Sequence, residues 1–241
     1  MSGAFLGELL GTMTLVFLGN SVVAGAVLKD TKSSGGGWMV ITTGWAVAVF
    51  MGICVAQAVG SPAAQINPAV TIAFAVLGGD WSNVVPFIAA QLIGGFLGAV
   101  LMWVYYLPHF GKTEDPGLKL AVFCTGPAIR DYRYNAVCEV MGTIVLVGGV
   151  AAIVSPGFSG QEGFSAGVVP FLVAFLVWGI GLSLGGTTGY AINPARDLPP
   201  RLAHAVLPIP GKGSSDWSYA VIPVLAPVVG GLVLAMAMIQ A

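Results

Sequence analysis

Six apolar segments, each nearly free of charge, constrain this chain more than any other feature of its sequence. They cover residues 4–27, 38–59, 82–106, 135–155, 164–184 and 217–239. A helix needs about 20 apolar residues to cross the hydrocarbon core of a bilayer, and each segment reaches that length. Only 8% of the residues are charged, too few to solvate the surface of an ordinary soluble domain. The sequence therefore predicts an all-α membrane protein with six transmembrane helices.

The balance of charged and reactive residues excludes several functions. Nine Lys and Arg against ten Asp and Glu leave no basic surplus for a nucleic-acid backbone. The three cysteines, Cys54, Cys124 and Cys138, are too few and too scattered for a disulfide framework or a zinc cluster. The chain also lacks a Ser/His/Asp arrangement, a metal-ligand cluster or a phosphate loop. We expect no enzyme activity, no cofactor, no metal and no nucleic-acid partner.

Two connections, residues 60–79 and 185–206, do not read as plain loops because each contains an Asn-Pro-Ala triplet. The asparagine can act as N-cap, and proline suits the first helical position. About ten residues of helical character follow, which rise only about 15 Å, half of the hydrocarbon thickness. We expect two half-spanning re-entrant helices whose amino ends meet near the midplane. The triplets are Asn67, Pro68, Ala69 and Asn193, Pro194, Ala195.

The two halves of the chain resemble each other. Glu8–Thr12 has the pattern Glu-x-x-Gly-Thr, which recurs in Glu139–Thr143, and the triplets recur at a similar offset. Three spans and a half helix, repeated once, indicate an inverted two-fold repeat, because three is odd and the second copy enters from the opposite face. We expect one transmembrane channel domain, with repeat one at about 1–107, repeat two at about 135–241 and a loop at about 108–134.

These motifs resemble the aquaporin superfamily of major intrinsic proteins along the whole chain. Added to the triplets and the Glu-x-x-Gly-Thr pair are Gln91-Leu92-Ile93-Gly94-Gly95 and Asn193-Pro194-Ala195-Arg196-Asp197. Asp197 directly after Arg196 is similar to the glycerol-facilitator, or aquaglyceroporin, branch. The resemblance implies the aquaporin fold, a homotetramer with one pore per chain, and a multi-pass location in a bacterial plasma membrane.

The resemblance also implies a narrow selectivity filter at Trp45, Gly181, Tyr190 and Arg196. Water-selective relatives usually hold histidine where this chain has Gly181, and the best-known glycerol facilitators hold phenylalanine where it has Tyr190. A glycine leaves room for carbon, while the five donors of Arg196 can bind neighbouring hydroxyls. Taken alone, Trp45 would be interpreted as a residue of the aromatic belt at the membrane interface. Its occurrence together with Gly181, Tyr190 and Arg196 favours a place in the filter.

Irregular backbone at membrane depth must be buried in protein or line a wet cavity, so the segments before the triplets should offer carbonyls to a pore. Asn67 and Asn193 can each cap a helix through the amide oxygen and donate into the pore through NH2. The positive ends of the half helices repel protons and other cations. The chain departs from the family's Ser-Gly-Ala-His, with about two extra residues after Trp45. The expected pore-lining carbonyls are those of Ala63, Ala64, Gln65, Gly189 and Ala191.

Two acidic residues, Glu8 and Glu139, lie inside spans, where an ionisable group is a functional candidate. In the resembled family such glutamates brace the half-helix loops, and Asp197 is expected to brace as well; a proton relay is the alternative. His204 is expected to be a solvated or capping group, and Lys119 is expected to be a loop charge. All nine Lys and Arg fall in the first, third and fifth connections. The topology of the resembled family places these connections outside the cell, whereas the positive-inside rule would place them in the cytoplasm. We expect the orientation of the family.

We therefore expect a passive channel for glycerol and other small neutral solutes plus water, embedded in the lipid bilayer and closed to ions and protons. Dihydroxyacetone, urea and undissociated small acids fit the same chemistry. The alternatives are a coupled secondary transporter, which also uses inverted repeats and broken helices, and a water-dominant channel.

Overall fold

The computed structural model describes residues 3–160, 165 and 167–240. Every regular element within these ranges is a helix. Five helices are long and apolar enough to cross a membrane. They are α1 (Gly3–Val27), α2 (Gly37–Val59), α4 (Val84–Tyr105), α7 (Tyr132–Val154) and α11 (Val221–Ile239). Each overlaps a segment that the sequence predicts as a span, so the prediction of an all-α membrane protein is confirmed.

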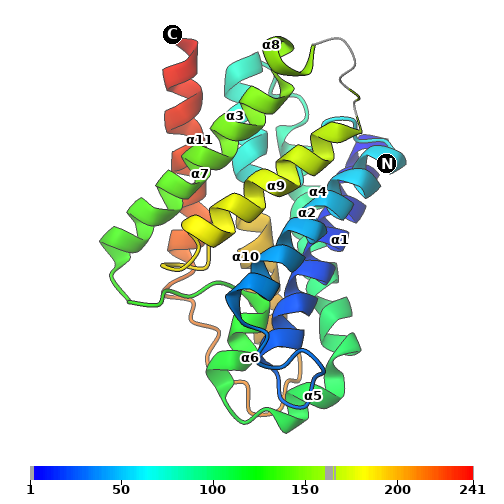
Figure 1. Cartoon of the computed structure of the whole chain (residues 1–241), viewed down its shortest axis with the longest axis vertical. Coiled ribbons are helices and arrows are strands. Elements are labelled where there is room, and N and C mark those ends of the chain that lie inside the picture. The colour runs from blue at the N-terminus through cyan, green and yellow to red at the C-terminus, as the bar shows by residue number, and fades with distance from the viewer. Residues whose placement is uncertain (1–2, 161–164, 166, 241) are drawn as a thin grey trace.

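The sixth predicted span corresponds to α9 (Val168–Ser183), which has 16 residues. At 1.5 Å per residue it reaches about 24 Å, less than the other long helices. It lies obliquely across the bundle in Figure 1. Residues 164 and 166 of the predicted segment 164–184 fall outside the described ranges.

Two short helices follow the Asn-Pro-Ala triplets, as the sequence predicts: α3 (Pro68–Gly78) and α10 (Pro194–Val206). Both have an asparagine N-cap in extended conformation and proline in the first turn. The side-chain oxygen of Asn67 accepts from the amide of Ala69, and Asn193 accepts from Ala195, both at 2.9 Å. With 11 and 13 residues, neither helix crosses a bilayer.

The half helices are exchanged between the two halves of the fold. In the first half α1 packs against α2 and α4, and in the second half α7 packs against α11 and α9. The half helix α3 of the first half packs mainly on α11 of the second, and α10 of the second half packs mainly on α4 of the first. The Gly94-Gly95 pair of α4 makes this possible, because small residues let helix backbones approach closely. A Cβ at Gly94 would overlap the carbonyl oxygen of Leu9 in α1, and one at Gly95 would overlap that of Ala195 in α10.

The predicted loop at 108–134 is wrong in part, because it contains two short helices, α5 (Leu107–Lys112) and α6 (Pro116–Phe123). Asp115 caps α6 by accepting from the amide of Gly117 at 2.7 Å, and Pro116 occupies its first turn. Local capping thus gives a helix within a polar connection. A further short helix, α8 (Pro156–Ser159), follows α7.

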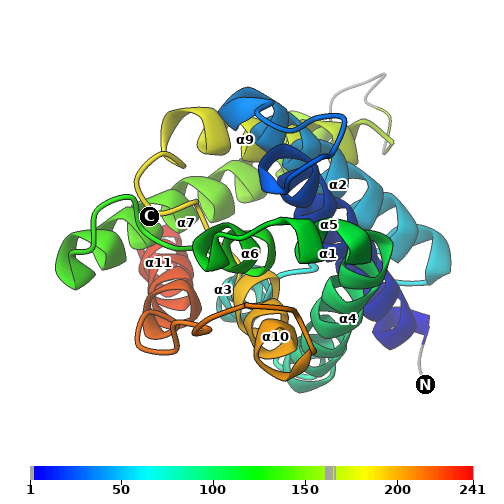
Figure 2. The ribbon, with the colours of Figure 1, turned by 90° about the horizontal axis from the view of Figure 1, so that it is seen from below.

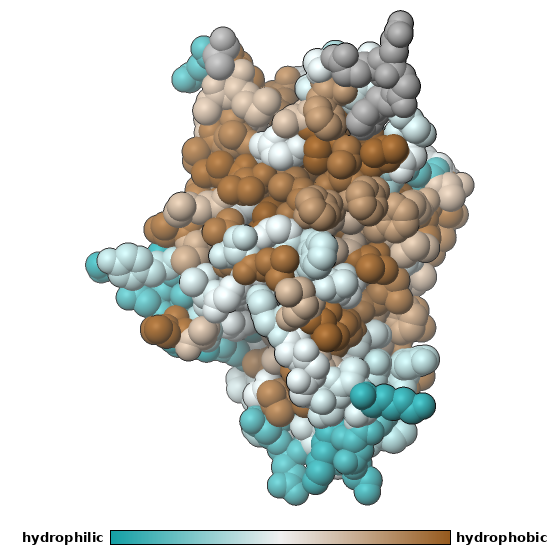
Figure 3. All heavy atoms as spheres, viewed as in Figure 1, coloured by the Kyte–Doolittle hydropathy of each residue, from teal (hydrophilic) through white to brown (hydrophobic). Residues whose placement is uncertain are grey.

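The two ends of the bundle differ in polarity. Both chain termini point to the upper end in Figure 1, while α5 and α6 close the lower end and lie in front when the molecule is seen from below in Figure 2. Hydrophilic residues gather at the lower end in Figure 3, beneath a broad hydrophobic band. We call the end that carries α5, α6 and residues 28–36 the charged end, and the opposite end the terminal end.

A candidate pore through the helix bundle

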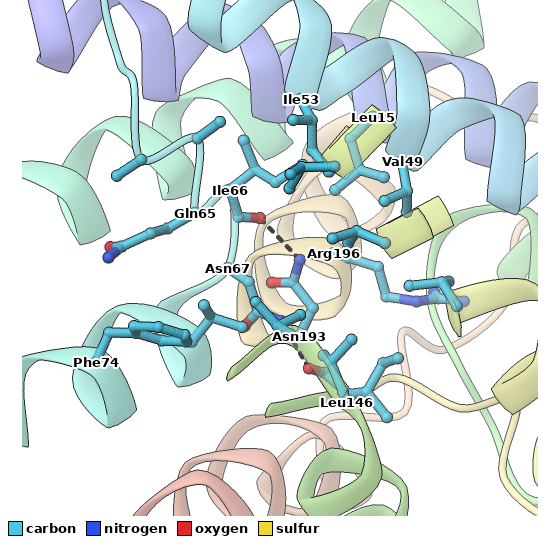
Figure 4. A pocket seen from close by; sticks show the side chains of 18 of the residues that line it. Leu15, Val49, Ile53, Gln65, Ile66, Asn67, Phe74, Leu146, Asn193 and Arg196 are labelled. Atoms are coloured by element: carbon cyan, nitrogen blue, oxygen red, sulfur yellow. Dashed lines mark hydrogen bonds between the residues drawn. The ribbon is translucent and has the colours of Figure 1, made fainter. Parts of the chain in front are cut away.

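The amino ends of α3 and α10 touch each other through their capping asparagines. Asn67 Nδ2 donates to the carbonyl of Ile192 at 2.8 Å, and Asn193 Nδ2 donates to the carbonyl of Ile66 at 2.9 Å (Figure 4). The two half helices therefore meet head to head, as the sequence predicts. An amide NH2 has two N–H donors, so this cross-connection occupies one of them and leaves the other for a solute.

The segments before the two asparagines share an unusual backbone conformation. One and three residues before each asparagine, the φ angle is positive at a residue other than glycine: 45° at Ile66 and 42° at Ala64, then 44° at Ile192 and 40° at Tyr190. Such residues cost free energy and persist only where surrounding structure holds them. The match between the halves extends to individual backbone angles, which the sequence did not reveal.

Glu8 holds the first of these segments. Its Oε1 accepts from the Ser61 hydroxyl at 2.7 Å and the Gln65 amide at 2.8 Å, while Oε2 accepts from the Ile66 amide at 2.7 Å. The Gln91 side chain of α4 donates to the same Oε2 at 2.8 Å. The buried carboxylate thus satisfies two backbone N–H groups in a segment that has no helix or sheet to satisfy them.

Glu139 occupies the equivalent place in the second half. Its two carboxylate oxygens accept from the backbone amides of Ala191 and Ile192, both at 2.9 Å. Glu139 is 1% exposed and Glu8 is fully buried. Each glutamate is therefore bound to the loop that precedes the half helix of its own half of the chain.

Asp197 binds at the charged end instead, where it joins α10 to residues 124–131. Its Oδ2 accepts from the amide and the hydroxyl of Thr125 at 2.7 and 2.6 Å. Its Oδ1 accepts from Arg201 Nε and Nη2 at 3.0 and 2.9 Å. Arg201 also donates to the carbonyls of Ser215 and Asp216. Sequence reasoning missed Arg201, although its position four residues after an aspartate in a helix is the signal of such a pair.

Two polar residues that the sequence places at the surface are buried. Solvation is therefore wrong for His204, and Lys119 is a buried residue of α6 rather than a loop charge. His204 is fully buried, and its Nδ1 lies 2.8 Å from the hydroxyl of Ser215. Lys119 is 3% exposed and donates to the carbonyls of Pro210 and Gly211. Folding of the long connections over α10 buries them, an effect of distant packing that a local pattern does not show.

Two cavities lie inside the bundle, and the larger, on the terminal side, is lined by the half-helix junction itself, including Asn67 and Asn193. The terminal-side cavity has a volume of about 340 Å³, and the charged-side cavity about 210 Å³. Three residues line both cavities, namely Trp45, Tyr190 and Arg196. The cavities thus adjoin at three of the four residues that the resemblance assigns to a selectivity filter.

The four predicted filter residues lie close together at this constriction. The guanidinium carbon of Arg196 lies 4.3 Å from the centre of the Trp45 ring. A Cβ at Gly181 would lie 2.8 Å from Cζ of Tyr190, so the tyrosine ring faces the bare backbone of α9. Trp38, which the sequence did not single out, donates from its indole N–H to the Gly181 carbonyl at 2.9 Å.

The residues predicted to offer carbonyls divide between the two cavities. Arg196 Nη2 donates to the Gly189 carbonyl at 3.4 Å, which fixes one of these acceptors beside the constriction. The cavity walls are otherwise mainly apolar, with side chains such as Val49, Ile53 and Val177. Ala63, Ala64, Gln65 and Ala191 line the terminal-side cavity, and Gly189 lines the charged-side cavity.

Long apolar helices around two half helices that meet head to head, with cavities that adjoin at one constriction, define a membrane channel. Comparison with known proteins agrees, since residues 1–238 match the family described as Major intrinsic protein. The chain belongs to this family, and it is a multi-pass membrane protein rather than an enzyme.

Similar proteins cover almost the whole chain. A probable glycerol uptake facilitator protein of Thermotoga maritima is 53% identical over 95% of this chain and 94% of its own length. A glycerol uptake facilitator protein of Streptococcus pneumoniae is 52% identical over 95% of both chains. The X-ray structure of the aquaglyceroporin from Plasmodium falciparum superposes with a TM-score of 0.83 at 26% identity, over 97% of this chain and 93% of that one.

Proposed function

We propose that the chain is a passive channel for glycerol and other small neutral solutes plus water, closed to ions and protons. The observation that carries this proposal is the constriction where the two cavities adjoin, lined by Trp45, Tyr190 and Arg196 beside the bare Gly181. The glycerol facilitators among the similar proteins support glycerol as the solute.

The constriction offers a glycerol molecule two different surfaces. Arg196 supplies fixed N–H donors for hydroxyl oxygens, and the faces of Trp45 and Tyr190 supply apolar contact for the carbon chain. Gly181 contributes no side chain, which lets the Tyr190 ring lie against the backbone of α9, where a histidine would displace it. Water makes use of the donors alone, so this combination favours a polyol.

Exclusion of cations follows from the half-helix junction. Each half helix places roughly half a positive charge at its amino end, and the contacts of Asn67 and Asn193 bring the two ends together. A cation that sheds its water there meets positive ends rather than a carboxylate. We propose that the carbonyls of Ala63, Ala64, Gln65, Gly189 and Ala191 lead a neutral solute past this point.

The two buried glutamates favour a channel over a coupled transporter. A coupled transporter needs a site for its driving ion, and Glu8 and Glu139 are the only acidic residues in the six long helices described above. Each of their carboxylate oxygens already accepts a hydrogen bond from a loop before a half helix. We propose that both residues brace these loops, and that Asp197 braces the segment around Thr125 at the charged end.

The assembly and the range of solutes extend the same proposal. The chain forms one transmembrane domain of two inverted repeats, about 1–107 and 135–241, joined by 108–134, and assembles as a homotetramer in the lipid bilayer with one pore per chain. Dihydroxyacetone, urea and undissociated small acids are neutral and carry hydrogen-bonding groups like those of glycerol, so they are further candidate solutes.

Stopped-flow light scattering on proteoliposomes tests the proposal. The solutes are water, glycerol, urea and lactic acid at a pH where it is neutral, each compared with empty vesicles. We expect glycerol flux well above that of empty vesicles and no dependence on a pH gradient. Water flux without glycerol flux would indicate a water-dominant channel, and solute accumulation that follows a pH gradient would indicate a coupled transporter.

A further inference from the structure

Four side chains that line the cavities each hold a buried polar atom without a hydrogen-bond partner among the described residues. Buried polar groups in proteins are otherwise almost always paired, so these atoms are candidates for contact with a solute. Trp45 and Tyr190 belong to the constriction, and Gln65 belongs to the loop before α3; Asn20 has no role so far. The atoms are Asn20 Oδ1, Trp45 Nε1, Gln65 Oε1 and the Tyr190 hydroxyl.

Asn20 lies in α1 and lines the charged-side cavity, although it is only 1% exposed. Its Nδ2 donates to the carbonyl of Phe123 at 3.4 Å, next to the stretch that Thr125 ties to Asp197. Because the carboxamide is planar, this bond also fixes Oδ1; the reverse orientation would set two oxygens against each other. The protein therefore holds a carbonyl acceptor in place and leaves it unpaired.

Two other polar side chains of this cavity, those of Thr125 and Arg196, already donate hydrogen bonds within the protein. The Thr125 hydroxyl donates to Asp197 at 2.6 Å, and Arg196 donates to the Gly189 carbonyl. Arg196 brings donors and no acceptor. A hydroxyl group both donates and accepts, so a solute with several hydroxyls can donate to Asn20 through one and accept from Arg196 through another.

We propose that Asn20 is a specificity-determining residue of the charged-side cavity, where its Oδ1 accepts a hydrogen bond from a hydroxyl of a small neutral polyol. This rests on the proposed function and deepens it. A molecule of water can occupy one of the two contacts at a time, whereas a polyol can occupy both. Asn20 therefore strengthens binding of the polyol relative to water before the narrowest part of the pore.

The test is Asn20→Leu, which keeps the size of the side chain and removes its acceptor. Tracer glycerol exchange in proteoliposomes gives the glycerol concentration at half-saturation, and light scattering gives water permeability in the same vesicles. We expect the half-saturating glycerol concentration to rise about fivefold, the worth of one hydrogen bond, while water permeability stays unchanged. An unchanged half-saturation overturns the proposal. A parallel fall of glycerol and water flux also overturns it, because Asn20 would then only position the Phe123 segment.

Ser21→Ala is the matched control, because Ser21 follows Asn20 in α1 and lines neither cavity. Its buried hydroxyl also has no partner among the described residues. We expect wild-type values for it; the same shift as in Asn20→Leu would contradict the proposal. Where Asn20→Leu fails to insert, Asn20→Val replaces it in the same comparison. A wild-type protein without glycerol flux overturns the proposed function and this inference together, whereas a conducting wild type matched by Asn20→Leu overturns this inference alone.

Discussion

Gly19 of α1 leaves the space that the indole ring of Trp45 occupies. A Cβ at position 19 would overlap the six-membered part of that ring, and Trp45 is only 3% exposed. The guanidinium carbon of Arg196 lies over the same indole, 4.3 Å from the centre of the ring. The absence of a side chain in one helix thus sets the position of an aromatic wall of the pore.

Gly19→Ala should therefore narrow or close the channel. The added methyl group either pushes the indole towards Arg196 or strains the core, which typically costs about 1–3 kcal/mol. We expect glycerol and water permeability to fall together, with a lower melting temperature. Gly179→Ala is the control, because a Cβ there meets no atom of the described residues within 4 Å. Wild-type flux in Gly19→Ala would show that the ring has room to move.

Gly181→Ala should reduce glycerol flux more than water flux. A Cβ at this position would lie 2.8 Å from Tyr190 Cζ and 3.1 Å from Thr42 Cγ2, so it would displace the tyrosine ring from its place at the constriction. Stopped-flow measurements of both permeabilities give the ratio. Gly186→Ala, where a Cβ meets open space, should keep the wild-type ratio. An unaltered ratio in Gly181→Ala would remove this glycine from the filter.

Arg196→Ala should weaken discrimination against charged solutes. Its guanidinium supplies the fixed positive charge and the donors of the constriction, and its loss opens space beside Trp45. We expect measurable proton and cation leakage in vesicle assays, with neutral-solute flux retained. If Arg196→Ala had the same selectivity as the wild type, Arg196 would not be part of the filter.

Glu139→Gln should destabilise the protein. Glutamine keeps one acceptor oxygen but turns its NH2 towards the amide of Ala191 or Ile192, which leaves a buried N–H unpaired at a cost of about 1–3 kcal/mol. We expect a lower thermal midpoint in detergent and lower channel activity per folded molecule. If Glu139 were a proton relay instead, the variant would keep its stability and lose only a pH-dependent part of transport.

The ion pair between Arg130 and Asp216 should weaken in acid. It joins the loop before α7 to the loop before α11 at 2.6 Å. Partial burial raises the pKa of Asp216, but hydrogen bonds from Arg130 and Ser218 lower it. The resulting pKa is below the ordinary value of 3.8. A carboxyl whose pKa is lower in the folded state stabilises it above the unfolded pKa, and this contribution is lost as pH falls through the folded value.

We therefore expect the melting temperature of the wild type to drop more than that of Asp216→Asn when pH is lowered from about 6 to below 3.8. The effect should be small, because Arg130 is 44% exposed and exposed pairs contribute little. Equal pH dependence of the two proteins would show that the pair does not stabilise the fold.

Much of the architecture could be predicted because it follows from local rules. Apolar length defines the spans, and an asparagine followed by proline starts each half helix, so α3 and α10 begin where the sequence indicates. The burial of His204 and Lys119 depends instead on how distant connections fold over α10. The helices α5 and α6 were missed because a short capped helix in a polar connection has no apolar pattern.

The candidate site divides in a similar way. The resemblance placed Trp45, Gly181, Tyr190 and Arg196 together, and the structure brings them to one constriction, although their roles remain predictions. Asn20 and Gly19 were overlooked because a single residue carries no periodic signal. An amide in an apolar span was nevertheless a usable sign, since polar groups at membrane depth are expensive to bury.

The contacts between the capping asparagines have a consequence for how the chain is made. Asn67 binds the carbonyl of a residue 125 positions further along, and Asn193 binds one 127 positions before it. The first half of the chain leaves the ribosome before the second half is synthesised. The side-chain amide of Asn67 therefore emerges before the carbonyl of Ile192 that it binds has been made. In a chain that ends before residue 192, the Asn67 side chain lacks the carbonyl that it binds in the folded protein.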